Sequence, residues 1–163
     1  MISRGRTSLG GQTLEQVIKA LRLVDFEVMP MKEYRKLVQG NLFAPTRLLV
    51  QNHPYTTIFG TPGRREYYII SSQWTGELEC KFQNQGGSVD EKMVYIAETL
   101  KRTALDRLAV VYGGAFWTKQ KRGQAVIKWM KAETKAIRHT YGKELLVMDF
   151  DQFLTWVKRT WGR

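Results

Sequence analysis

The segment Glu77-Leu78-Glu79-Cys80-Lys81-Phe82-Gln83 alternates polar and apolar side chains. Because successive side chains of a β-strand point to opposite faces, this alternation predicts a strand over residues 77–83. The apolar face, which we expect to join the core, consists of Leu78, Cys80 and Phe82. The other face is a row of charged and amide groups made of Glu77, Glu79, Lys81 and Gln83.

The residues before this segment predict further strands. Residues 65–71 form a β-rich run that should pair with residues 77–83 as a hairpin. Upstream, residues 47–51 and 55–59 are also β-rich, and we expect Asn52-His53-Pro54 to separate them into two strands. Gly60-Thr61-Pro62-Gly63 predicts a turn.

Helical periodicity flanks these strands. An apolar stripe at i, i+3, i+4 and i+7 predicts a helix from Thr13 to about Leu23, after a flexible Gly10-Gly11. Met31 to Val38 is a second helical piece. Ser88 and Glu91 fit a capping box, which starts a helix expected to reach about Leu105.

The C-terminal part alternates apolar runs with helical stretches. Residues 108–112 and 144–148 predict buried strands, and residues 123–140 predict a helix that buries Ile127, Met130 and Ile137. Asp149 or Asp151 should cap a final helix. This order of elements predicts an α/β fold with a mixed sheet. A length of 163 residues suits one domain over residues 1–163.

An acid-x-Lys triplet occurs at residues 79–81, 90–92 and 133–135. The second lies at a helix start and the third within a helix, where side chains two residues apart point in different directions. Only Glu79 and Lys81 lie on a strand and so share a face. The predicted hairpin brings Glu66 beside them.

Two carboxylates next to a lysine suit phosphodiester hydrolysis. Carboxylates supply the hard oxygen ligands that Mg²⁺ prefers, and the metal activates water and neutralises charge on the phosphate. The lysine can orient the water or stabilise the transition state. The alternative is a solvated strand face with cross-strand Glu–Lys pairs, and the pattern alone favours neither.

The chain is basic, with 26 Lys and Arg against 15 Asp and Glu, a net charge of +11, and +8 of it within residues 107–163. Such a surface attracts a phosphate backbone, so nucleic acid is the expected partner, although a solubilising surface charge is the alternative. Part of this charge lies in a loop and part along one strip of the helix predicted at 123–140. The expected nucleic-acid-binding residues are Lys119, Lys121, Arg122, Lys128, Lys131, Lys135 and Arg138.

Several classes are excluded by composition. One cysteine, Cys80, cannot form an internal disulfide, and two distant histidines, His53 and His139, make no zinc site. No apolar run reaches the length of a membrane span, and no apolar segment follows the N-terminal residues as in a signal peptide. We therefore expect a protein of a reducing, cytoplasmic setting without membrane contact.

Several segments resemble one known family. Residues 64–68 followed by 77–83, then Gly86-Gly87-Ser88-Val89-Asp90-Glu91-Lys92, residues 110–114 and residues 152–156 resemble the PD-(D/E)xK nuclease superfamily. The resemblance covers roughly residues 10–158. It implies a restriction-endonuclease-like αβββαβ core with a mixed central sheet flanked by helices, and here a C-terminal βα extension.

The resemblance also implies roles for single residues. Glu79 would be the acidic metal ligand of the (D/E)xK triplet and Lys81 its catalytic lysine. Gln83 matches a glutamine that contacts substrate or orders the site, and Glu15 matches a helix glutamate that completes the metal shell. Glu66 stands where the family usually has aspartate, and would bind the same metal through a longer arm. Glu77 is the nearest rival ligand.

The expected activity is that of a Mg²⁺-dependent DNA endonuclease, with Mn²⁺ as a substitute, in a bacterial or phage-infected cell. Cleavage of both strands of a duplex implies a homodimer or a higher homo-oligomer. The alternatives are a Holliday-junction resolvase or exonuclease of the same superfamily, and a nucleic-acid-binding protein that has the fold without catalysis.

Overall fold

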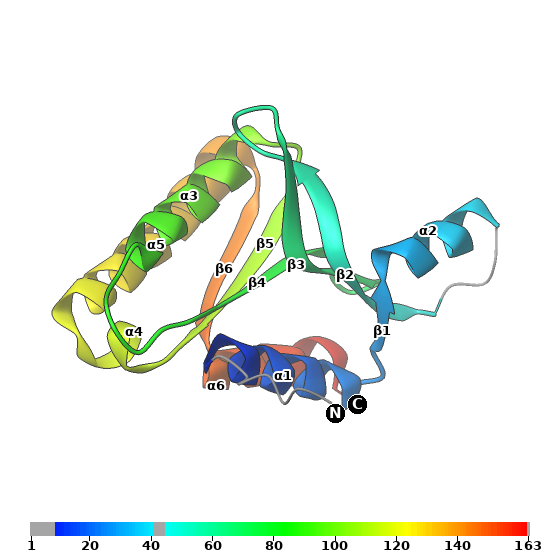
Figure 1. Cartoon of the computed structure of the whole chain (residues 1–163), viewed down its shortest axis with the longest axis horizontal. Coiled ribbons are helices and arrows are strands. Elements are labelled where there is room, and N and C mark those ends of the chain that lie inside the picture. Colours follow the sequence, from blue (N-terminus) through cyan, green and yellow to red (C-terminus); the bar gives the residue numbers. More distant parts are fainter. Residues whose placement is uncertain (1–8, 41–44, 163) are drawn as a thin grey trace, which may run out of the picture.

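The computed structural model describes residues 9–40 and 45–162. In this part of the chain, six strands form one mixed sheet whose strand order follows the chain (Figure 1). The neighbouring pairs β2–β3 and β3–β4 are antiparallel, and the other neighbouring pairs are parallel. The strands are β1 (Glu27–Pro30), β2 (Arg47–Thr56), β3 (Pro62–Ser71), β4 (Gly76–Phe82), β5 (Arg107–Gly113) and β6 (Glu144–Asp149).

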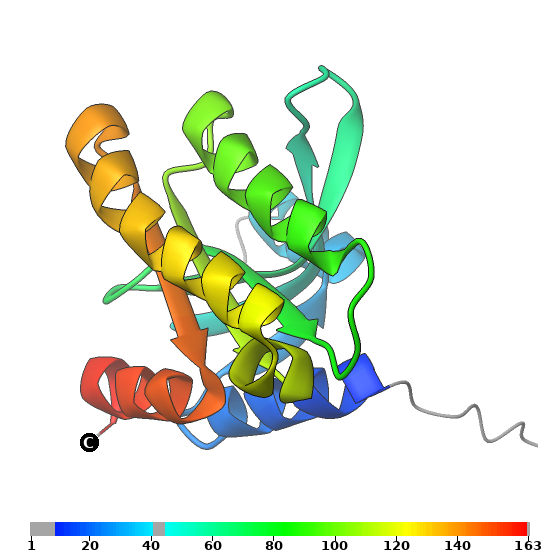
Figure 2. The same ribbon diagram turned by 90° about the vertical axis from the view of Figure 1, so that its left-hand side faces the viewer.

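Helices cover both faces of the sheet, as two perpendicular views show (Figures 1 and 2). The helices are α1 (Leu9–Arg22), α2 (Met31–Gln39), α3 (Val89–Arg102), α4 (Ala115–Lys119), α5 (Lys121–Tyr141) and α6 (Phe150–Trp161). Helices α1 and α6 lie on one face, and α3, α4 and α5 lie on the other. Helix α2 stands beside β1 and β2 and buries none of its residues.

Each face of the sheet has its own core. Leu78 and Cys80 of β4 pack with Leu21 of α1 and Trp156 of α6. This confirms that Leu78 and Cys80 of the predicted apolar face join a core, whereas Phe82 is only half-buried. On the other face, residues of β5 and β6 pack against α3, α4 and α5. Within the described residues, no helix combines the length and apolarity needed to cross a membrane.

The N-terminal part differs from the prediction at two places. Helix α1 begins at Leu9 rather than Thr13 and includes Gly10 and Gly11, which were expected to precede it. Strand β1 was not predicted at all. Its four residues pair in parallel with β2, starting at Glu27 opposite Leu48. A strand this short is stabilised by its partner strand. It was not predicted because its four residues carry no alternation long enough to be recognised.

The predicted break at Asn52-His53-Pro54 is wrong, since β2 runs through it. Asn52 takes a φ of 55°, a conformation that asparagine tolerates better than most residues, and Pro54 still lies opposite Arg64. The strand ends at Thr56 rather than at Phe59. The following turn is held by the Thr57 hydroxyl, which accepts backbone N–H groups from the two sides of the turn.

The C-terminal half follows the predicted order, with β5, α5, β6 and α6 in place and a short unpredicted α4. The capping box predicted at Ser88 and Glu91 is wrong, because Ser88 makes no capping hydrogen bond through its side chain. Helix α3 ends at Arg102 instead of Leu105. A capping box does occur at α6, where Asp149 accepts the Gln152 N–H at 2.8 Å and Gln152 accepts the Asp149 N–H at 3.1 Å. The αβββαβ core and its βα extension are confirmed.

Candidate active site

The candidate site lies where β3 and β4 separate. The two strands pair from Ile69 opposite Gly76 to Tyr67 opposite Leu78. One step further along, the Cys80 N–H donates to Glu66 Oε2 at 2.7 Å. A carboxylate side chain thus takes the place of a backbone carbonyl, and the divergence of the strands makes room for it.

Glu79 and Lys81 lie beside this carboxylate. Lys81 Nζ donates to Glu79 Oε1 at 2.5 Å, and the two side chains are only 17% and 12% exposed. Glu79 Oε2 lies 3.5 Å from the backbone nitrogen of Glu66. The structure therefore brings Glu66, Glu79 and Lys81 together, as the hairpin was expected to do.

The electrostatics of the site disfavour two ionised carboxylates without a bound cation. Burial raises the pKa of Glu66 above its ordinary value, and the negative charge of Glu79 raises it further. The Lys81 ammonium, the Cys80 N–H and the Arg65 guanidinium oppose this shift without overcoming it. A cation between the two carboxylates would remove the penalty.

Arg65 was not singled out by sequence reasoning. It is 3% exposed, and its guanidinium carbon lies 4.5 Å from the centroid of the Tyr55 ring. Its Nε and Nη2 are buried and have no hydrogen-bond partner among the residues that the structure describes. Its charge lowers the pKa values of Glu66 and Glu77, against the larger effect of their burial. Arg65 is therefore a buried positive charge among the acidic groups of the site.

Glu77 does not lie on a solvated face, contrary to the sequence-based expectation of a polar row. It is 0% exposed, and its Oε1 lies 2.7 Å from Nδ1 of His53. Burial raises the pKa of Glu77, although the hydrogen bond to His53 acts in the opposite direction. The pairing with His53 makes Glu77 a weaker candidate for a metal ligand than Glu79. No local pattern links two residues 24 positions apart, so the sequence could not indicate this pair.

The structure does not bring the remaining predicted residues to the two carboxylates. Gln83 is half-buried, and its side-chain amide donates to the Gln85 carbonyl at 2.7 Å. Glu15 is exposed on α1. Within residues 9–40 and 45–162, no three His, Cys, Asp or Glu side chains come close enough to hold a metal ion together. Glu66 and Glu79 thus form a pair, and the roles predicted for Gln83 and Glu15 stay predictions.

Helix α4 holds the end of β4 in place through hydrogen bonds. The indole N–H of Trp117 donates to the Lys81 carbonyl at 3.1 Å, and the Phe116 N–H donates to the Gln83 carbonyl at 3.0 Å. Gly114 has a φ of 101°, and a Cβ at this position would lie 2.3 Å from the Gln83 oxygen. These contacts fix the backbone that carries Lys81.

The predicted basic residues are all exposed: Lys119 ends α4, and the others lie on α5, including Lys121 and Arg122, which were expected in a loop. Arg122 is held by an ion pair with Asp90 at the start of α3. Lys131 Nζ lies 5.9 Å from the centroid of the Tyr112 ring, and Tyr112 is the β5 neighbour of Lys81. Lys128 and Lys131 line a shallow cavity with Tyr112 and Trp117. Part of the basic surface therefore adjoins the strand end that carries Lys81.

A family model described as a PD-(D/E)XK nuclease superfamily domain matches residues 6–161, nearly the whole chain. The chain belongs to the PD-(D/E)XK nuclease superfamily. This confirms the resemblance based on the segments around Glu66 and Glu79-Cys80-Lys81. No curated protein and no solved structure gives a match to the chain.

Nucleases of this superfamily generally use divalent metal ions, and the donor set of the site fits such an ion. Mg²⁺ is usually bound by one or two carboxylates, with waters and substrate phosphates as its other ligands. Glu66 and Glu79 supply two carboxylates whose mutual repulsion a cation would relieve.

Proposed function

We propose that the protein is a Mg²⁺-dependent DNA endonuclease, with Mn²⁺ as a substitute metal. The observation that carries the proposal is the convergence of Glu66, Glu79 and Lys81 at the separation of β3 and β4. Membership of the nuclease superfamily supports the reaction class, and the basic surface of α5 supports a polyanionic substrate.

Glu66 and Glu79 would hold the metal. When bound, the ion polarises the phosphate and lowers the pKa of a bound water. Lys81, fixed against Glu79, is a point charge that can orient the attacking water or stabilise negative charge on the phosphate in the transition state. Arg65 contributes a buried positive charge that keeps the acidic groups together before substrate arrives.

The basic residues of α5 would bind the DNA backbone. Contacts of this kind position a duplex and carry no sequence information by themselves. For cleavage of both strands, two copies of the chain related by a two-fold axis would place one site on each strand, so we propose a homodimer on DNA.

The test compares supercoiled, linear and four-way-junction DNA in Mg²⁺, in Mn²⁺ and in EDTA. An endonuclease converts supercoiled plasmid to nicked and linear forms only with metal. Degradation from the ends of linear DNA would instead indicate an exonuclease, and selective cutting of the junction would indicate a resolvase. Binding without cleavage of any of these substrates in either metal would contradict the proposal in favour of a binding protein.

A further inference from the structure

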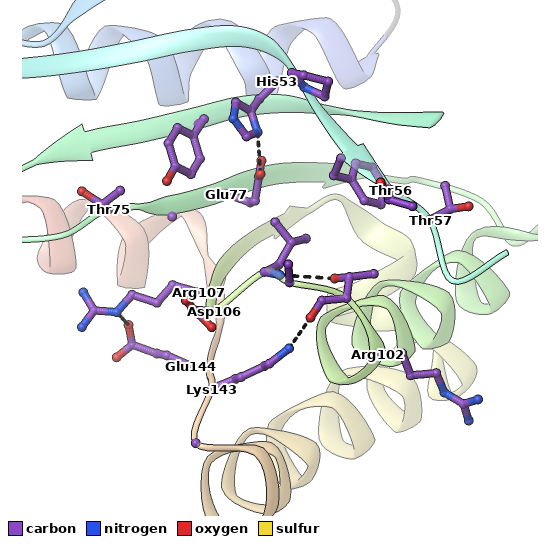
Figure 3. A pocket seen from close by; sticks show the side chains of 18 of the residues that line it. His53, Thr56, Thr57, Thr75, Glu77, Arg102, Asp106, Arg107, Lys143 and Glu144 are labelled. Carbon is purple, nitrogen blue, oxygen red and sulfur yellow. Dashed lines mark hydrogen bonds and ion pairs between the residues drawn. The ribbon is translucent and has the colours of Figure 1, made fainter. Parts of the chain in front are cut away.

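A cavity of about 1040 Å³ opens on the same side of the sheet as Glu79, between the β2–β3 hairpin and the ends of α3 and α5 (Figure 3). Hairpin residues Thr56 and Thr57 line it on one side and the segment 102–107 on the other. Its charged lining residues are Glu77, Arg102, Asp106, Arg107, Arg138, Lys143 and Glu144.

His53 is held rigidly in the wall of this cavity. Its Nδ1 lies 2.7 Å from Oε1 of the buried Glu77, and the two side chains point toward each other (Figure 3). One face of the imidazole stacks on the Tyr68 ring, with centroids 4.1 Å apart and an interplanar angle of 13°. The His53 side chain keeps 21% of its surface exposed. Among the described residues, no hydrogen bond occupies Nε2, so this nitrogen is available to a ligand.

The cavity lies close to the candidate active site, although Glu66, Glu79 and Lys81 do not line it. Glu77 and Glu79 lie two residues apart on one face of β4, which corresponds to about 7 Å along a strand. Tyr55 lines the cavity and also feels the negative charge of Glu79. A chain molecule bound at Glu66 and Glu79 would therefore reach His53 with its next unit.

The size and lining of the cavity limit what this unit can be. The volume is that of a small-molecule site and is too small for a duplex, but it accepts a sugar–phosphate unit of one strand. Arg102 and Arg138 bring positive charge to the lining, Arg102 as the ion-pair partner of Glu98, while Asp106 and Glu144 bring negative charge. A phosphate oxygen is the acceptor that an imidazole N–H and guanidinium groups favour together.

We propose that His53, oriented by Glu77, donates a hydrogen bond from Nε2 to a backbone phosphate that flanks the scissile bond. This inference rests on the proposed function, because it places the flanking phosphate beside the metal carboxylates. His53 is the substrate contact, and Glu77 is a positioning residue that acts through it.

The test uses binding in EDTA, so that it does not depend on cleavage. His53 and His139 are the two histidines of the chain, which gives two imidazole Cε1–H signals in a proton–carbon NMR spectrum. A single-stranded thymidine octanucleotide is added, then the same octamer with uncharged methylphosphonate linkages, then inorganic phosphate at equal concentration. We expect the His53 signal to move with the charged octamer far more than with either of the others.

The matched variant is His53→Asn, whose amide can still donate to Glu77 but lacks the outward nitrogen. We expect it to weaken octamer binding about tenfold, whereas His139→Asn leaves binding unchanged. Glu77→Gln should weaken binding in the wild-type protein and add nothing in the His53→Asn background. In cleavage assays His53→Asn should raise KM and leave kcat within about threefold. Thermal unfolding of each variant reports whether the fold is kept.

The outcomes separate this inference from the proposed function. A His53 signal that responds to the charged octamer in a protein that cuts no DNA would support the phosphate contact and refute the nuclease. Normal cleavage, with full affinity and unchanged KM in His53→Asn, would overturn the phosphate contact alone. An equal response to inorganic phosphate would also overturn it, since it would identify a free-anion site. If His53→Asn does not fold, the octamer and methylphosphonate comparison on the wild-type protein decides.

Discussion

Glu66 and Glu79 approach each other where β3 and β4 separate, and the charge of Glu79 adds to burial in raising the pKa of Glu66. The pair is therefore unfavourable in the metal-free protein. Such an arrangement is expected at a site that binds a cation, because stability is given up for function there. Lys81 offsets the negative charge of Glu79 directly, through its hydrogen bond to Oε1. It offsets the charge of Glu66 only partly, since the pKa of Glu66 stays raised.

Replacing Glu66 by Gln should stabilise the metal-free protein at neutral pH. Below the ordinary glutamate pKa, Glu66 is protonated in both the folded and the unfolded state. As the pH rises from there through the raised folded pKa, the unfolded chain loses this proton first, so the free energy of unfolding falls. In EDTA, Glu66→Gln should lose this part of the pH dependence. Thermal unfolding between pH 4 and pH 8 measures it.

The same variant should lose its response to metal. A ligand present at about 100 times its Kd stabilises a folded protein by about 2.7 kcal/mol. Binding of Mg²⁺ should therefore raise the Tm of the wild-type protein. Glu66→Gln should show little or no rise. Glu91→Gln, an exposed carboxylate on α3, serves as the control and should respond as the wild-type protein does. An equal rise in all three proteins would place the metal elsewhere.

Glu79→Gln and Lys81→Met should each lower the cleavage rate by at least about 100-fold, as loss of a transition-state-stabilising group does in other enzymes. Both changes keep the size of the side chain, so the fold should be kept. Lys92→Met tests the second acid-x-Lys triplet, whose lysine is exposed on α3, and should cut DNA at the wild-type rate. The measurement is single-turnover cleavage of plasmid in Mg²⁺. Full activity of either site variant would remove that residue from the mechanism.

The sequence could predict the pairing of Glu79 with Lys81 because period-2 alternation determines which side chains share a face. It could not predict that Glu77, on the same face, is fully buried. Burial there depends on His53 and Tyr68 of the β2–β3 hairpin, which are distant from Glu77 in the sequence. Alternation gives the direction of a side chain and says nothing about what covers it.

The same limit explains the errors in the fold. Strand β1 exists because β2 offers it a partner, and Asn52 continues β2 in a conformation that propensities assign to turns. Helix α5 was predicted within two residues at its start because its apolar periodicity is local. The site residues that were missed, Arg65 and His53, owe their positions to pairing between strands rather than to any pattern of their own.

Reversing the charge of Lys128, Lys131 and Lys135 together should weaken DNA binding for every sequence tested. Each lost phosphate contact should also reduce the slope of log K against log salt by about 0.9. Reversal of Lys19, Lys158 and Arg159 is the matched control, since these exposed residues lie on α1 and α6, across the sheet. Fluorescence anisotropy between 50 and 300 mM salt gives both quantities. Equal losses in the two variants would mean that net charge, and not the face of α5, determines affinity.

Gly123→Ala should lower both stability and activity, whereas Gly142→Ala should lower stability alone. A Cβ at Gly123 would lie 2.0 Å from the Phe116 carbonyl oxygen, so α4 must move away from α5, and Trp117, which donates to the Lys81 carbonyl, moves with it. We expect a loss of about 1–3 kcal/mol, as for other overpacked positions. Gly142, at the end of α5, has a φ of 66° and open space around it, so alanine there costs about 1–2 kcal/mol of backbone strain. Chemical denaturation and single-turnover cleavage on both variants test whether the support from α4 matters for Lys81. Wild-type cleavage by a destabilised Gly123→Ala would show that it does not.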